Sequence, residues 1–503
     1  MSNSENEEER EFQSLAHHPS APLHESFDVA TTVDPSYVIS LIRKLLPSNV
    51  KDGENALRSG LIQEELKTDD IKENSINLLE NGEAEAMESS EEVKVDGPQP
   101  RDDNQNRGGS AGEEIWEECG CIIWDLAASE DHAGFMVQNL ILEVLLANLM
   151  VSQSSRITEI SLGIIGNLAC HEVPRKQIAS TDRLVRALVD QLLLDDVPCL
   201  CEACRVLTLC LQGSEGVIWA EALQAEQILS RILWIAENAL NPQLIEKSVG
   251  LLLAALESRQ EVAAILLPPM LKLDLSSVLI KLLAFEMGKL KEERIPERYT
   301  VLDLILRTIE ALSILDDYSQ EIYLNKELLQ LLKELIQLPD KFEVASSCVT
   351  AAVLVANILN EATNLATELS KDLSFLQGLF DVFPFASGDT EAQSAIWSVI
   401  AKLLTMVKDS EMSPSMFHVL VSILASKLDL IEDKLLVHPL DHREKETSGT
   451  NLDSGAIAMK RIFDLLTRWK SLDDEIKKIA SVEDYHINDE DVDKLFHFCK
   501  ASG

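Results

Sequence analysis

Aromatic residues and basic residues are both scarce in this sequence. Phe, Trp and Tyr make up 5% of the 503 residues, whereas apolar residues as a whole make up 46%. The apolar content is therefore mostly aliphatic, which favours helix packed on helix. The 44 Lys and Arg residues stand against 85 Asp and Glu residues, which gives a net charge of −41. That charge repels phosphate and anionic lipid, so we expect no direct binding of nucleic acid or of a membrane surface.

Signals for secretion or membrane insertion are missing as well. The chain opens with the polar, acidic stretch MSNSENEEEREF, and the apolar run at 144–155 is too short to span a bilayer. The nine cysteines should therefore be reduced. These features predict a protein of the nucleus, the cytoplasm or both, with no transmembrane segment.

Motifs for metal, phosphate or nucleophilic chemistry are also absent. Cysteines cluster at 199, 201, 204 and 210, but helical positions two apart point in nearly opposite directions, which favours buried thiols over a zinc site. Gly163 and Gly166 lie in a helical pattern and lack the spacing of a phosphate loop. We therefore expect no enzyme, no cofactor, no metal and no small-molecule substrate. An enzyme with an unfamiliar site is a distant alternative.

The chain does contain leucine-rich helical segments at regular spacing. Six segments align with steps of 42, 45, 59, 44 and 45 residues. Four of the five steps lie within the range of about 40–47 residues that is typical of armadillo and HEAT repeats. The charged stretch 286–298 should supply an extra loop in the long step. The positions aligned are Asn167, Leu209, Ala254, Ser313, Asn357 and Lys402.

This spacing predicts an all-α, armadillo/HEAT-like, right-handed α-solenoid with a disordered acidic N-terminal region. The acidic arm should cover 1–110, where 24 acidic residues face 10 basic ones. The repeats should occupy 113–430, and a divergent helical cap should follow at 455–500.

A short helix at 34–46 interrupts the acidic arm. Asp34 is a suitable N-cap, Pro35 a first-turn proline and Pro47 a stop, and the apolar residues between them share one stripe. A lone helix of this length is marginal in water. It should dock either on the N-terminal end of the solenoid, which we favour, or in the groove of a partner.

Residues 113–180 resemble the serum amyloid A-like protein family. The matching features are the opening helix with Trp124-Asp125, the turn at Glu130-Asp131, the helix Gly163–Cys170 with Gly166 and Asn167 inside it, and the turn at Ile178–Asp182. The resemblance implies an armadillo-type scaffold without catalytic activity, intracellular and expected in the nucleus, with a link to cell proliferation. It supplies no established binding residues.

We therefore predict a non-catalytic scaffold or adaptor with protein partners that are expected to be basic. The alternative is a transport receptor for basic cargo, since importin-type armadillo proteins hold an extended peptide with a row of asparagines. Only Asn167 and Asn357 occupy such positions here, and this incomplete row argues against long-peptide capture. Both asparagines are candidate protein-binding residues, although Asn167 could instead bind a neighbouring helix.

Overall fold

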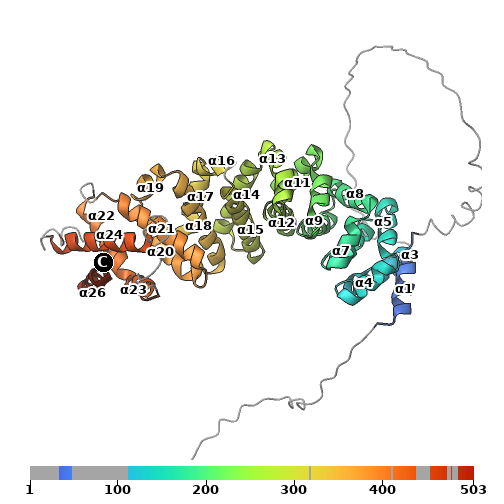
Figure 1. The fold of residues 1–503 in the computed structure, drawn as a ribbon, viewed down its shortest axis with the longest axis horizontal. Coiled ribbons are helices and arrows are strands. Elements are labelled where there is room, and N and C mark those ends of the chain that lie inside the picture. Colours follow the sequence, from blue (N-terminus) through green and yellow to red (C-terminus); the bar gives the residue numbers. More distant parts are fainter. Residues whose placement is uncertain are drawn as a thin grey trace, which may run out of the picture.

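The structure, a computed structural model, is a long stack of helices (Figure 1). It describes residues 33–47, 111–315, 319–408, 412–437, 454–472, 477, 485 and 487–502. Helices and no strand occur in these ranges, so the predicted all-α class is confirmed. The acidic arm predicted at 1–110 lies outside the described residues except for 33–47.

Three parallel series of helices run along the stack. The long helices pack each on the next, from α3 to α24. They are α3 (Ala111–Leu126), α6 (Ser155–Ala169), α9 (Val197–Leu211), α12 (Pro242–Glu257), α15 (Pro296–Ser313), α18 (Ala345–Glu361), α21 (Thr390–Met406) and α24 (Ser454–Lys470). Up to α21, a helix in each series is followed three α-helices later by its equivalent, as expected of armadillo repeats with three helices each.

The other two series flank the long helices. In each repeat of three helices, we call the two that precede the long helix the first and the second helix. The second helices are α5 (Ile141–Val151), α8 (Asp182–Asp190), α11 (Glu226–Asn238), α14 (Leu275–Glu292), α17 (Lys326–Ile336), α20 (Leu373–Val382) and α22 (Pro414–Ser426). The first helices are α4 (Glu130–Gln138), α7 (Glu172–Ala179), α10 (Gly216–Leu223), α13 (Gln260–Lys272), α16 (Ser319–Tyr323) and α19 (Asn364–Leu369). Outside the series lie α1 (Pro35–Lys44), α23 (Leu428–Val437), α26 (Asp489–Ser502) and the 3-10 turns η2 (Gln191–Leu193), η3 (Phe342–Val344) and η4 (Phe383–Ala386).

Side-chain caps define where the long helices begin. Asp196, Asn241 and Asp389 each accept a hydrogen bond from a first-turn backbone N–H of α9, α12 and α21. Such caps satisfy donors that a helix leaves open at its N-terminus. Proline follows in the first turn of α9 and α12, where its missing N–H costs nothing. By contrast, α15 and α18 begin without a side-chain cap.

The long step between α12 and α15 contains longer helices and no extra loop. The stretch 286–298 was expected to form a loop, but α14 continues through it to Glu292 and α15 begins at Pro296. The extra residues lengthen α13 to 13 residues and α14 to 18, against 8 in α10 and 13 in α11. The loop prediction was wrong because buried Met287 and Leu290 hold the charged stretch helical.

Two consecutive prolines, Pro268 and Pro269, lie inside α13. Proline removes a backbone donor and disfavours a helix interior. Leu266, Leu267 and Met270 are buried on either side of the pair, and α13 packs on α10 and α12. Tertiary packing therefore outweighs the local preference.

The N-terminal helix α1 docks on the end of the stack, the first of the two alternatives considered. Val38, Leu41, Ile42 and Leu45 are buried against α3 and α4. The carbonyl of Leu45 accepts two hydrogen bonds, from Trp116 Nε1 at 2.9 Å and Asn148 Nδ2 at 2.8 Å. These donors satisfy a carbonyl at the end of α1 that the helix itself leaves open.

In the part of the chain that the structure describes, one helical stretch, Phe342–Glu361, is long and apolar enough to cross a membrane, and two sharply bent helix pairs would pass the same test if each were one span. The expectation of no transmembrane segment considered only 144–155 and overlooked this stretch. In this fold α18 packs between α15 and α21, with Cys348, Leu354 and Leu359 fully buried. Burial within the stack accounts for its apolar composition.

Candidate protein-binding face

The sides of the long helices that turn away from the core form what we call the long-helix face. Several of its charged side chains occur in pairs of opposite sign. Glu202 lies 2.6 Å from Arg205, Glu246 lies 2.8 Å from Lys247, and Glu257 lies 3.5 Å from Arg307. Each of these three acidic side chains on α9 and α12 is therefore balanced by a basic neighbour.

The first repeats place Trp124, Gly163, Asn167 and Arg205 in one cluster. Asn167 Nδ2 donates to the carbonyl of Trp124 at 2.9 Å, so α6 is tied to α3. Arg205 Nη1 donates to Asn167 Oδ1 at 3.2 Å and Arg205 Nη2 to the carbonyl of Gly163 at 3.0 Å, so α9 is tied to α6. Arg205 Nε donates to Glu202 at 2.7 Å. One asparagine thus bridges three consecutive long helices.

The two glycines of this segment are explained by the side chains that lie on them. A Cβ atom at position 163 would lie 2.1 Å from the Trp124 ring, and one at position 166 would lie 2.3 Å from the Arg205 guanidinium. Any side chain larger than hydrogen would displace these neighbours. The glycines therefore allow an indole and a guanidinium to lie flat on the backbone of α6.

The remaining residues of the family motif lie outside this cluster. Asp125 is exposed on α3, and Cys170 is exposed at the end of α6, where its thiol faces the carbonyl of Gly166 at 3.5 Å. Sequence reasoning missed Arg205. It lies one repeat, 42 residues, beyond Gly163, so the repeat spacing was the available signal.

Asn357, the second candidate, also binds a neighbouring long helix. Its Nδ2 donates to Ser313 Oγ at 3.0 Å, which ties α18 to α15. Lys402, at the next aligned position, donates to the carbonyl of Leu359 at 3.3 Å, and its burial lowers its pKa. Four of the aligned positions, Asn167, Ser313, Asn357 and Lys402, therefore carry contacts between successive repeats.

A half-buried carboxylate lies further along the face, on α15. Burial raises the pKa of Glu310; the guanidinium of Arg307 opposes the shift, and the carboxylates of Glu257, Asp389 and Asp303 add to it. Asp303 also accepts a hydrogen bond from Ser346 of α18 at 2.9 Å. This part of the face is more acidic than the Asn167 cluster, which contains Trp124, Gly163, Asn167 and Arg205.

The four clustered cysteines are buried side chains of α9. Cys199 faces the main core and donates to the carbonyl of Ser155 at 3.2 Å, whereas Cys201 packs in a separate small cluster with Leu244. Burial raises the pKa of Cys199, Cys204 and Cys210 to about 12 and that of Cys201 to about 11. Within the described ranges no three potential ligands come together around a metal position.

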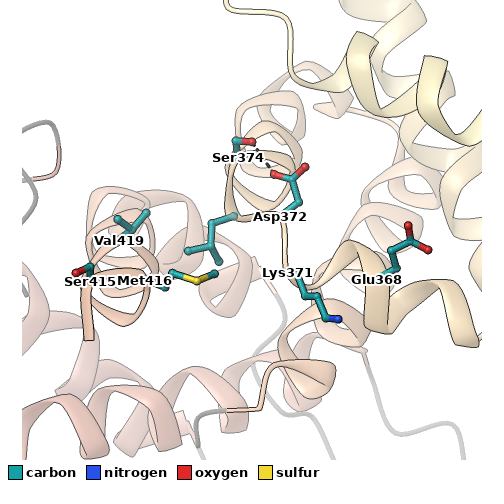
Figure 2. Close-up of a pocket in the computed structure, with 8 residues that line it drawn as sticks. Glu368, Lys371, Asp372, Ser374, Ser415, Met416 and Val419 are labelled. Carbon is teal, nitrogen blue, oxygen red and sulfur yellow. Dashed lines mark hydrogen bonds between the residues drawn. The ribbon is translucent and has the colours of Figure 1, made fainter. Parts of the chain in front are cut away.

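An open hollow of about 480 Å³ lies between the start of α20 and the start of α22 (Figure 2). Leu373, Met416 and Val419 form its apolar part. Its polar side chains come from Glu368, Lys371, Asp372, Ser374 and Ser415. Asp372 is already bound, because it lies 2.6 Å from Lys333 of α17 and accepts from Ser374. The hollow contains no arrangement of groups suited to acid–base or nucleophilic chemistry.

Comparison with known proteins agrees with the resemblance seen in residues 113–180. The chain is 33% identical over 147 residues to "Protein saal1" of Danio rerio and 32% identical over 129 residues to "Protein SAAL1" of Homo sapiens. The resemblance to the serum amyloid A-like family is confirmed. The matches cover 29% and 25% of this chain and 31% and 27% of the SAAL1 proteins, so this chain spans less than a third of their length. No family model matches the sequence.

Among solved structures, the chain is similar to "Designed armadillo repeat protein YIII(Dq.V1)4CPAF in complex with peptide (KR)4", with a TM-score of 0.39 and 16% identity over 49% of this chain and 95% of that one. An engineered protein aligns over 79% of this chain and 98% of its own, with a TM-score of 0.40 and 14% identity. The chain is similar to SAAL1 in part of its sequence. Its own structure is that of a helical repeat protein.

Proposed function

We propose that this protein is a non-catalytic interaction scaffold or adaptor that binds partner proteins along the long-helix face. The observation that supports this most is the Asn167 cluster. It joins α3, α6 and α9 through three hydrogen bonds made by Asn167 and Arg205. A face held in this way loses little freedom when a partner binds, which lowers the cost of association.

The partner is proposed to be basic. Residues 111–503 contain 61 acidic and 34 basic residues, so the stack itself carries a net charge of −27. This charge would accelerate encounter with a positive partner over long range, although basic neighbours balance three acidic side chains of the long-helix face. Location in the nucleus or cytoplasm and a link to cell proliferation belong to the same proposal and rest on the family resemblance.

The transport-receptor alternative has less support. It requires asparagine amides that are open to the backbone of a cargo peptide. Asn167 Nδ2 and Asn357 Nδ2 each donate to a neighbouring long helix instead. We therefore propose that these two asparagines contribute to partner binding by positioning the face.

Two pairs of substitutions test the use of this face. Gln243→Lys with Thr405→Lys adds two positive charges to exposed positions of the long helices α12 and α21. Gln177→Lys with Gln227→Lys adds the same charge to exposed positions of α7 and α11 and serves as the control. Affinity purification of the full chain from cells, with quantitative mass spectrometry, should show partner loss for the first variant only. Equal recovery of partners with both variants would refute the proposal.

A further inference from the structure

Five successive repeats place an apolar residue on the same edge of the stack. The edge is formed by the connections that lead from α8, α11, α14, α17 and α20 to the following long helix. We call these five residues the apolar edge; they are Leu193, Leu240, Ile295, Phe342 and Phe385. The side chains of Leu240 and Phe342 are 77% and 80% exposed, those of Leu193 and Phe385 are 56% and 38% exposed, and Ile295 is half-buried.

This row follows the repeat. The steps between the five residues are 47, 55, 47 and 43 residues. The longer step between α12 and α15 therefore appears in this row as well. Scattered exposed apolar residues are ordinary on protein surfaces. The other two sets of connections contain such scattered cases, Leu140, Ile314 and Leu324, between polar residues such as Thr181, Gln224 and Arg259. Among the described connections, an apolar residue recurs in these five successive repeats only along the apolar edge.

Hydrogen bonds join the central part of the edge into one surface. Arg298 Nη2 donates to the carbonyl of Leu240 at 3.4 Å, and its guanidinium lies 5.5 Å from the centre of the Phe285 ring. Arg294 reaches the next connection, where it donates to Asp340 Oδ2 at 2.8 Å, two residues before Phe342. Charged groups thus lie between consecutive apolar positions.

From this arrangement we propose that the apolar edge binds an extended polyproline II segment of a partner protein, with an apolar side chain at every third residue and Lys or Arg among the others. Packed helices lie about 8–10 Å apart, and three residues of polyproline II rise about 9.3 Å and return to the same side. A β-strand repeats on one side every 6.8 Å or so and does not match this spacing. An α-helix would set apolar residues over the charged groups between the repeats.

The charges on the edge favour a basic segment. Asp195, Asp340 and Glu343 have side chains that are 89%, 63% and 49% exposed, and each has one arginine partner, shared in the case of Asp340 and Glu343. A second copy of this chain is a poor occupant, because two molecules with a net charge of −41 repel each other. Aromatic side chains commonly line the surfaces that bind proline-rich segments, and Phe342 and Phe385 supply them here.

The probe for this proposal is a labelled peptide of five repeats of Leu-Pro-Lys, titrated with the full chain by fluorescence anisotropy. A peptide with Ser in place of Leu tests charge alone. A peptide of the same composition with its leucines clustered tests spacing. An amphipathic leucine–lysine helix tests the rival conformation. We expect the regular peptide to bind at least about tenfold more tightly than the other three.

Variants then locate the site. Leu240→Ser with Phe342→Ser should weaken binding of the regular peptide at least about tenfold, because each exposed apolar side chain loses its contact. Ile314→Ser with Leu324→Ser, which removes exposed apolar residues from other connections, should leave it unchanged. Thermal unfolding checks that both variants fold. No binding of the regular peptide, equal binding of a control peptide, or unchanged binding to the Leu240/Phe342 variant would overturn the proposal. The Gln243/Thr405 variant should retain the regular peptide's preference over the clustered one, so this result is separate from that for the long-helix face.

Discussion

At the scale of single residues, the glycines of α6 illustrate how a side chain from elsewhere dictates a residue type. Inside a helix, alanine is favoured over glycine by about 1 kcal/mol. At position 163 that preference is overridden, because the Trp124 ring occupies the place of a Cβ atom. The glycine is thus explained by the indole on α3 and not by the local helix.

Gly163→Ala should therefore lower the free energy of unfolding by about 1–3 kcal/mol, since the indole must move off α6. Gly250→Ala in α12 is the matched control, because a Cβ atom there would have no side chain of another element within 4 Å. It should raise stability by about 0.5–1 kcal/mol. Urea unfolding followed by circular dichroism measures both. Stabilisation by both substitutions would show that Trp124 does not occupy this place in solution.

The sequence predicted part of this cluster. It placed Gly163 and Gly166 in a helical pattern, and it offered a bond between Asn167 and a neighbouring helix as one of two interpretations. It did not reveal Arg205, because nothing local to VPCLCEACRVL shows that this side chain turns back onto the preceding repeat. Partners across repeats are fixed by stacking, which single-sequence patterns describe only through their period.

At the scale of elements, α1 is held by four buried apolar side chains and by the two hydrogen bonds to the Leu45 carbonyl. Periodicity and caps were sufficient to predict this helix, because its stripe and its prolines are local features. Its bonds to Trp116 and Asn148 were not predictable, since these donors lie 71 and 103 residues away.

Leu41→Ser should detach α1 from α3, because it removes a fully packed side chain at a cost of about 2–4 kcal/mol and buries a hydroxyl. Hydrogen exchange measured by mass spectrometry should become fast in 35–45 and remain slow in α9 to α21. Tyr37→Ser changes an exposed residue of the same helix and should leave exchange unaltered. Slow exchange in 35–45 of the Leu41 variant would contradict this account of the docking.

At the scale of the whole molecule, each repeat contacts mainly its neighbours, so stability should be distributed along the stack and not shared by all of it. The regular period made this architecture predictable. The longer α13 and α14 were not, because a charged stretch with two buried apolar positions resembles a loop as closely as it resembles a helix.

Trp397→Ala tests this locality. The indole is buried in α21, with ring centres 6.1 Å from Phe380 and 5.5 Å from Phe383, and its loss should cost about 3–5 kcal/mol. Exchange protection should fall in α18 to α24 and persist in α6 and α9. The exposed Trp234→Ala in α11 should change protection little anywhere. A uniform fall along the entire chain for Trp397→Ala would indicate a single cooperative unit instead.

The extended repeat formed by α13, α14 and α15 has a consequence for recognition. A surface built from equivalent units offers a bound molecule several positions of similar energy, among which it could shift. Here the unit that contains α13 is longer than the unit before it, because α13 exceeds α10 by five residues, or about 7.5 Å of helix. A unit that differs from its neighbours makes these positions unequal in energy, so a partner that contacts this unit is held at one position along the molecule.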